Sequence, residues 1–76
     1  MWNEIDNQLI RTFKFKNFID AWAFVSKIAL IAEKMDHHPT WTNTYNRVEI
    51  RLTTHDAGNT VTDKDRMLAA KIDDLT

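Results

Sequence analysis

The first part of the chain alternates between apolar and polar residues. Across residues 9–16, Phe13 and Phe15 fall on one face, and polar or basic residues occupy the positions between and beside them. A period of two residues is typical of a strand with one buried face. We therefore predict a half-buried strand over Leu9–Lys16, preceded by a shorter strand within Trp2–Asn7 and a turn at Asp6-Asn7-Gln8.

A second alternation lies in the middle of the chain. Between residues 47 and 52, one face carries Val48, Ile50 and Leu52. The opposite face carries Arg47, Glu49 and Arg51. This pattern predicts the second arm of a β-hairpin that spans Thr40–Thr54 and turns near Tyr45-Asn46.

The stretch between these two alternations repeats at the spacing of a helix. Its two adjacent apolar rows are Phe18, Trp22, Val25, Ala29 and Ala32, and Ala21, Phe24, Ile28, Ile31 and Met35. So broad an apolar face indicates a helix that lies on a sheet, and the spacing places Trp22 in the core. Asn17 is the expected N-cap, with Asp20 in the capping-box position. Pro39 disfavours helical geometry before it, so we predict that the helix ends by about Asp36.

The C-terminal part of the chain predicts one more helix. After a loop through residues 56–59, Thr62 is the expected N-cap, with Asp65 three residues later. The apolar side of this helix contains Leu68, Ile72 and Leu75. The order β-β-α-β-β-α, without repeats or linkers, predicts a single domain over residues 1–76. Its class is α+β: a four-stranded antiparallel sheet with two helices on one face.

Length and cysteine content limit how such a domain is stabilised. The chain has 76 residues and no cysteine. A domain of this size buries only about 60% of the surface that its unfolded chain exposes, and no disulfide is available to support it. We therefore expect self-association into a homodimer or a homotetramer.

The charge balance and the apolar runs exclude other classes of partner. Ten Lys and Arg residues oppose eleven Asp and Glu residues, for a net charge of −1, whereas small nucleic-acid-binding domains carry a basic excess. The longest apolar stretch, near Ile28–Ala32, is too short to cross a membrane. Residues 1–4 do not resemble a signal peptide. We expect a cytoplasmic protein with neither a nucleic-acid nor a membrane partner.

The candidate chemistry lies in three histidines at the ends of the predicted elements. His37 and His38 occupy the break between the long helix and the hairpin, and His55 follows the last strand. If these ends meet at one edge of the sheet, the three imidazoles converge. An ordinary imidazole pKa of about 6.5 allows one ring to act as a base while another acts as an acid, which is what a dehydration requires.

Two other interpretations of the histidines remain open at this point. Loop histidines are often plain surface residues. A three-histidine metal site is disfavoured, because helix-borne ligands normally lie four residues apart, whereas His37 and His38 are adjacent and their side chains diverge.

Other polar and aromatic residues also have two interpretations. Asp65 is explained by helix capping. Trp41 and Tyr45 share a predicted strand face and are suited to stacking on a flat heterocycle or to packing in the core. Glu33 precedes His37 by one helical turn and is placed either to hold its imidazole or to be solvated surface.

Several segments together form a recognisable pattern. Residues 33–41 read Glu-Lys-Met-Asp-His-His-Pro-x-Trp, and residues 15–24 read Phe-Lys-Asn-Phe-x-x-Ala-Trp-x-Phe. Downstream follow Tyr45-Asn46, Thr53-Thr54-His55 and Thr62-Asp63-Lys64-Asp65. This pattern resembles the pterin-4a-carbinolamine dehydratases over nearly the whole chain. The resemblance strongly favours a functional histidine cluster.

The resemblance implies an activity and a set of site residues. Members of that family convert the carbinolamine to quinonoid dihydropterin for aromatic amino-acid hydroxylases, with no metal and no organic cofactor. His37 and His55 match the proposed acid/base pair, and His38 matches a histidine that orients the pterin. The residues implied at the substrate pocket are Asp36, Trp41, Thr53, Thr54, Asp56 and Asp65. The implied fold is the same antiparallel sheet with helices on one side.

Two features differ from the animal members of that family. The loop over residues 56–61 is about one residue longer and lacks their cysteine, and the chain starts almost at its first strand, without their N-terminal helical segment. Those relatives also act as a dimerisation cofactor for a homeodomain transcription factor, a role that the short N-terminus does not lead us to expect here. Two alternatives to the dehydratase stay open: a non-catalytic module that dimerises a partner protein, and action on another pterin, such as one linked to molybdenum cofactor.

Overall fold

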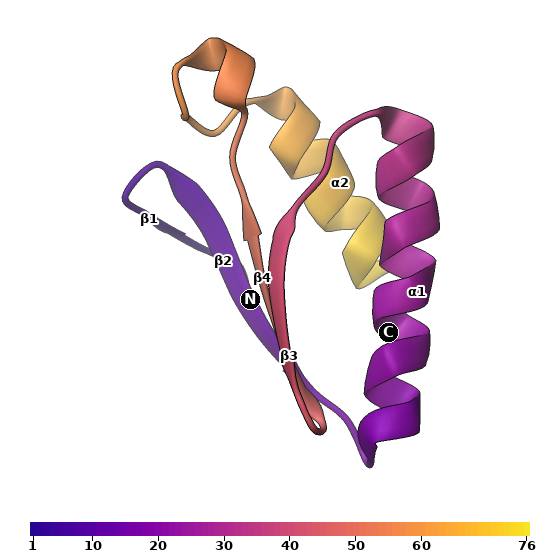
Figure 1. Ribbon diagram of the computed structural model, residues 1–76. Coiled ribbons are helices and arrows are strands. Elements are labelled where there is room, and N and C mark those ends of the chain that lie inside the picture. The colour runs from indigo at the N-terminus through magenta and orange to yellow at the C-terminus, as the bar shows by residue number, and fades with distance from the viewer.

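The computed structural model describes all residues, 1–76, and has one sheet with two helices packed against it (Figure 1). The strands are β1 (Asn3–Ile5), β2 (Gln8–Lys14), β3 (Thr40–Thr44) and β4 (Arg47–Leu52). The helices are α1 (Phe18–Met35) and α2 (Asp63–Asp73), with a short 3-10 turn, η1 (His55–Ala57), after β4. This order and the antiparallel pairing confirm the predicted α+β fold.

The sheet has the strand order β1-β2-β4-β3. The β1–β2 turn uses positive φ angles at both Asp6 and Asn7, 51° and 62°, as expected for a two-residue hairpin turn. The β3–β4 turn has a positive φ of 49° at Tyr45, where the Asn43 side chain donates to the carbonyl oxygens of Tyr45 and Arg47. Tyr45 therefore belongs to the turn and does not share a strand face with Trp41 as predicted.

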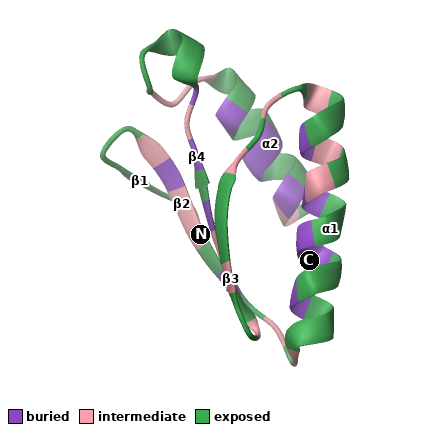
Figure 2. Cartoon of the chain, in the orientation of Figure 1, coloured by how far each residue is buried: buried purple, intermediate pink, exposed green.

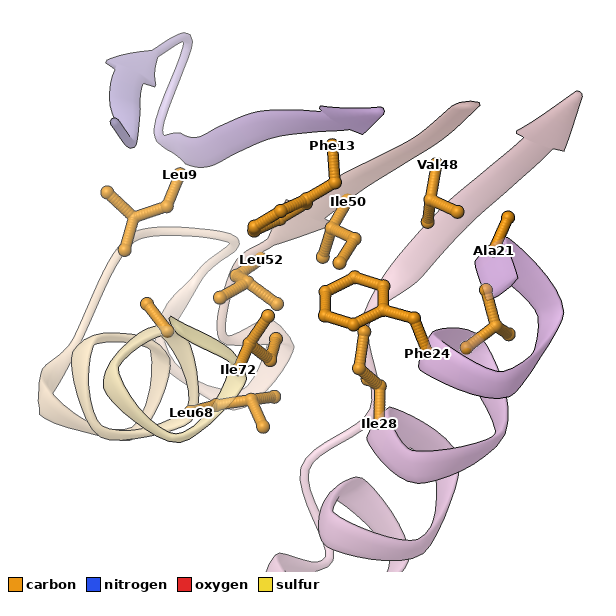
Figure 3. Close-up of a cluster of buried hydrophobic side chains, with 12 residues drawn as sticks. Leu9, Phe13, Ala21, Phe24, Ile28, Val48, Ile50, Leu52, Leu68 and Ile72 are labelled. Atoms are coloured by element: carbon orange, nitrogen blue, oxygen red, sulfur yellow. The ribbon is translucent and has the colours of Figure 1, made fainter. Parts of the chain in front are cut away.

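The core lies between the sheet and the two helices (Figure 3). Its twelve buried side chains are Leu9, Phe13, Ala21, Phe24, Val25, Ile28, Val48, Ile50, Leu52, Leu68, Ala69 and Ile72. The three alternate residues of β4 that the sequence assigned to one face are all among them, because β4 is an interior strand that both helices cover. Figure 2 shows the buried positions on the facing surfaces of the sheet and helices.

Helix α1 begins as predicted and buries less of its surface than predicted. The Asn17 side chain accepts a hydrogen bond from the Asp20 N–H at 2.9 Å, which confirms the N-cap. The prediction that Trp22 belongs to the core is wrong, because this residue is 53% exposed and stacks on the equally peripheral Phe18. A sheet of four short strands contacts only part of a helix whose apolar residues extend over more than one side.

The C-terminal end of α2 is attached by polar contacts to β2 and to the residue that precedes β1. The carboxylate of Asp73 accepts hydrogen bonds from Trp2 Nε1 at 2.9 Å and from Arg11 Nη1 at 2.8 Å. The Arg11 guanidinium also lies 4.4 Å from the centre of the Phe13 ring, within the range of a cation–π contact. The hydrogen bonds to Asp73 thus hold the C-terminal end of α2, which is the end far from the histidines, against the sheet.

Candidate functional site

A polar pocket of about 190 Å³ lies where the end of α1, the end of β4 and the start of α2 meet. Its lining contains no apolar residue and consists of Asp36, His37, His38, Thr53, Thr54, His55, Asp56 and Lys64. The three histidines, which are up to 18 residues apart in sequence, therefore face one space. The pocket forms because the end of α1 and the end of β4 lie close together, as expected from the sequence.

The end of α1 sets the position of the first two histidines. Asp36 adopts the left-handed conformation, with φ 52° and ψ 42°, and stops the helix as predicted. The His37 N–H then bonds back to the Ala32 carbonyl at 3.1 Å, a pattern typical of helix C-terminal motifs. The chain turns sharply over these residues, which directs His37 and His38 to different neighbours.

The position of His55 is set by a closed loop after β4. Thr54 and Thr60 form an isolated bridge, in which the Thr54 N–H donates to the Thr60 carbonyl at 2.9 Å. Between them, η1 ends at Gly58, whose φ of +80° favours glycine. The sequence predicted only a loop here, because three residues of 3-10 helix leave no periodic signal.

Asp65 lies beneath the pocket, fully buried at the first turn of α2. Its Oδ1 atom is 2.6 Å from Nε2 of His37, and its Oδ2 atom accepts hydrogen bonds from the Thr54 hydroxyl at 2.7 Å and the Thr62 N–H at 2.9 Å. The predicted capping function is therefore present on one oxygen. The other oxygen binds His37, a contact that no local pattern indicates.

The pKa of Asp65 is lowered from its ordinary value. Burial alone would raise this pKa, but hydrogen bonds from His37, Thr54 and the Thr62 N–H, together with the charge on the His37 imidazole, outweigh burial. Asp65 is consequently an ionised hydrogen-bond acceptor at neutral pH.

This assignment determines which nitrogen of His37 is available for chemistry. A carboxylate can only accept, so the hydrogen shared at 2.6 Å belongs to Nε2 of His37. The His37 side chain is only 11% exposed, and Nδ1 is the ring atom left to exchange a proton within the pocket. Asp65 therefore orients the ring, as the carboxylate does in a Ser-His-Asp triad.

The other two histidines have different environments. Nε2 of His38 lies 2.8 Å from Oε1 of Glu33 in an exposed pair. Of the two interpretations of Glu33, contact with His37 is not found, because the left-handed residue Asp36 moves the chain off the helical path; Glu33 is an exposed residue that binds His38. His55 is exposed and makes no side-chain hydrogen bond.

Not every implied pocket residue lies in the pocket. Thr53 lines it, although its hydroxyl donates to the Asn7 carbonyl at 2.9 Å. Trp41 lies outside it: its Cα pairs with that of Ile50, so its side chain stands on the helix-facing side of the edge strand β3. Lys64 lines the pocket and was not singled out from the sequence, although it lies beside Asp65 in the segment that carries the resemblance.

The surroundings of the three histidines are suited to proton transfer by imidazole. No group of three or more His, Cys, Asp or Glu side chains is arranged to hold a metal ion. One histidine is held by a buried carboxylate, one by an exposed carboxylate and one by none. Three imidazoles in different surroundings beside one small space can supply both a proton donor and a proton acceptor.

Comparison with known proteins identifies the family. The family model described as pterin 4 alpha carbinolamine dehydratase matches residues 1–75. The chain belongs to this family. A Prochlorococcus marinus (strain NATL2A) relative, named provisionally as a pterin-4-alpha-carbinolamine dehydratase, is 57% identical over 72 residues, covering 93% of this chain and 75% of the relative. A relative from Solibacter usitatus with the same provisional name is 53% identical over 74 residues, covering 97% of this chain and 77% of its own.

Solved structures agree with this family assignment. A transcriptional coactivator/pterin dehydratase from Brucella melitensis superposes with a TM-score of 0.89 at 46% identity, covering 95% of this chain and 78% of the other. A pterin dehydratase-like protein identified as a RuBisCO assembly factor in the alpha-carboxysome has a TM-score of 0.80 at 22% identity, covering 99% and 86%, and shares the fold. Neither helix of this family member is long and apolar enough to cross a membrane.

Proposed function

We propose that this protein dehydrates a 4a-hydroxytetrahydropterin to the quinonoid dihydropterin by histidine acid/base catalysis. The observation that carries the proposal is the set of three imidazoles around one polar pocket, with His37 held by the buried, ionised Asp65. The reaction would recycle the pterin that aromatic amino-acid hydroxylation consumes. It needs no resident cofactor, because only protons move and the leaving group is water.

The proposed step assigns a separate function to each histidine. Nδ1 of His37 removes the proton from N5 of the pterin, since Asp65 favours the imidazolium that forms. Protonated His55 donates a proton to the hydroxyl on C4a, which leaves as water while the C4a–N5 double bond forms. His38 contacts and orients the ring. Each well-placed proton-transfer group contributes about a hundredfold to the rate.

The remaining polar residues of the pocket suit the substrate. Asp36 and Asp56 present carboxylate acceptors and Lys64 presents an ammonium donor, and no apolar side chain lines the pocket. A pterin is a planar heterocycle with hydrogen-bonding groups along its pyrimidine edge, so a polar lining of this kind matches it. Another pterin with the same reacting atoms would fit the same chemistry.

The test is dehydration of a synthetic 4a-hydroxytetrahydropterin, followed by ultraviolet absorbance, with protein treated with chelator. We expect acceleration that survives the chelator, and a loss of about a hundredfold in kcat for His37→Ala and His55→Ala. His37→Gln preserves a donor for Asp65 while removing the proton-transfer group, and Lys71→Gln, on the far turn of α2, is the matched control. Full activity in both histidine variants would refute the assigned acid and base.

A non-catalytic function is the second candidate, because the same fold serves an assembly factor in the distant carboxysome protein. What favours the enzyme in this chain is the Asp65–His37 contact, which a scaffold has no need to build. A folded protein that leaves the spontaneous dehydration rate unchanged with every pterin tested would favour the scaffold.

Self-association is the remaining part of the proposal. Only 15 of the 76 residues are buried, whereas large apolar side chains along α1 remain exposed, namely Phe18, Ile19, Trp22 and Leu30. An exposed apolar stripe of this kind is typical of a surface that packs against another protein. We propose that a second copy of the chain covers it, in a homodimer or homotetramer.

A further inference from the structure

Lys64 is a cation in the histidine pocket that has no partner within the protein. It is the second residue of α2, it is exposed, and it forms neither an ion pair nor a side-chain hydrogen bond. Asp36 and Asp56 line the same pocket and are likewise outside every ion pair. The pocket thus presents one free ammonium and two free carboxylates to the molecule that enters it.

The residue preferences of the first turn of a helix do not explain a lysine at position 64. The first turn of a helix favours acidic residues, because the helix dipole places partial positive charge there, and Asp63 and Asp65 follow that rule. A lysine between them contradicts it, and no salt bridge compensates. Departures from local preference of this kind are expected where a residue serves a site.

The pyrimidine edge of a pterin is complementary to these charges. It carries two donors, the N3–H and the 2-amino group, next to one acceptor, the 4-oxo group. A carboxylate can take both donors, whereas an ammonium has three donors and no acceptor, so it can take only the oxo group. Carbon C4, which bears the oxo group, is bonded to C4a, where the hydroxyl leaves. A residue that donates a hydrogen bond to the oxo group must therefore lie close to the histidines, as Lys64 does.

From this arrangement we infer that Lys64 is a specificity-determining residue that recognises the 4-oxo group of the pterin, while a carboxylate of Asp36 or Asp56 takes the neighbouring donors. The inference rests on the proposed dehydratase function. It predicts discrimination between pterins and 2,4-diaminopteridines, which carry an amino group in place of the oxo group at C4 and have no hydrogen on N3. An amino donor facing an ammonium donor leaves both without a partner.

The experiment compares the dissociation constants of a stable oxidised pterin and of the 2,4-diaminopteridine with the same side chain, by fluorescence titration near neutral pH. For the unsubstituted protein we expect about tenfold tighter binding of the pterin, a modest ratio because Lys64 is exposed to solvent. Lys64→Gln should reduce the preference, since an amide can both donate and accept and so suits either C4 substituent, while the contribution of N3 remains. Lys64→Glu should reduce it further, and an acidic residue suits the first turn of a helix, so folding is retained. Lys71→Gln, outside the pocket on the same helix, should leave the preference unchanged.

Two outcomes overturn the inference and separate it from the proposed function. If the protein dehydrates the carbinolamine but binds both heterocycles equally, or if Lys64→Gln keeps the preference undiminished, the function stands and the assignment to Lys64 fails. If the protein neither binds the pterin nor accelerates dehydration, the pterin pocket itself is refuted along with the inference.

Discussion

At the scale of single residues, Asp65 connects the stability of the fold to the chemistry of the pocket. One carboxylate accepts from the first turn of its own helix, from the hydroxyl of Thr54 after β4 and from His37 after α1. These three elements are the ones that form the pocket. The orientation of His37 therefore depends on a group that a substrate does not reach.

Replacement of Asp65 by asparagine tests this dependence. An amide keeps the shape of the side chain but can donate to Nε2 of His37, which would place the hydrogen of the neutral ring on Nδ1 and remove the proposed base. We expect Asp65→Asn to lower kcat by about tenfold or more, with a smaller change in KM, measured by the same absorbance assay. An unchanged kcat in the folded variant would contradict the assigned role.

The lowered pKa of Asp65 also predicts a dependence of stability on pH. Because this pKa is lower in the folded than in the unfolded protein, the folded state binds fewer protons in acid. The contribution is therefore fully present above the unfolded pKa of about 4 and is lost as the pH falls through the lower folded value. Urea unfolding over this acidic range should show a steeper loss of unfolding free energy for the unsubstituted protein than for Asp65→Asn. If the unfolding free energies of the two proteins showed the same dependence on pH, the predicted contribution of Asp65 would be contradicted.

At the scale of elements, α2 links the two ends of the molecule. Its first turn holds Lys64 and Asp65 at the pocket, and its last turn holds Asp73 against Trp2 and Arg11. The apolar contacts of α2 come from only three fully or nearly buried residues, Leu68, Ala69 and Ile72. A helix with so small an apolar contact needs polar contacts to settle its position on the sheet.

Replacing Asp73 should measure that polar contribution. Asp73→Ala removes the acceptor for both Trp2 and Arg11, and we expect it to lower the unfolding free energy by about 1 kcal/mol, since all three groups retain some access to water. Asp74→Ala, one residue further, removes an equal charge that has no ion pair and should have little effect. Urea midpoints that shift equally for both variants would show that only the charge matters.

At the scale of the whole molecule, the outer surface of α1 is the feature that the monomer leaves unexplained. Leu30 and Ile19 are 74% and 71% exposed, although the sequence of α1 is apolar enough to bury both. One domain of this size has too few elements to cover the helix on all sides. We propose that a second copy of the chain packs against this surface of α1.

A charge on this surface should separate the copies. Leu30→Glu retains a good helix former but would place a charge in an apolar interface. We expect sedimentation velocity at micromolar concentration to show a dimer or tetramer for the unsubstituted protein and a smaller species for the variant. Thr76→Glu adds the same charge at an exposed residue outside α1 and should not change the oligomeric state. A monomer in the unsubstituted protein would refute the interface.

The sequence by itself determined the elements of this protein and the residues to suspect. Alternation along β4, the broad apolar face of α1 and the caps at Asn17 and Thr62 each depend on residues within one or two turns, so they can be recognised without a structure. The histidine motif and its resemblance to the dehydratases likewise reside in short, local runs of sequence. These signals located the three histidines, Asp36 and Asp65 before any fold was known.

Only the tertiary structure decided how these residues meet. The contact between His37 and Asp65 joins residues 28 apart, and it forms because α1 and α2 pack on one face of the sheet with their relevant ends adjacent. Glu33 binds His38 because the chain leaves α1 through the left-handed residue Asp36. Trp22 is exposed because the sheet covers only part of α1, and Lys64 lines the pocket because α2 begins there. Periodicity says which side of a helix is apolar. How much of that side is covered, and which charge lies opposite which histidine, depends on distances between elements that no local pattern contains.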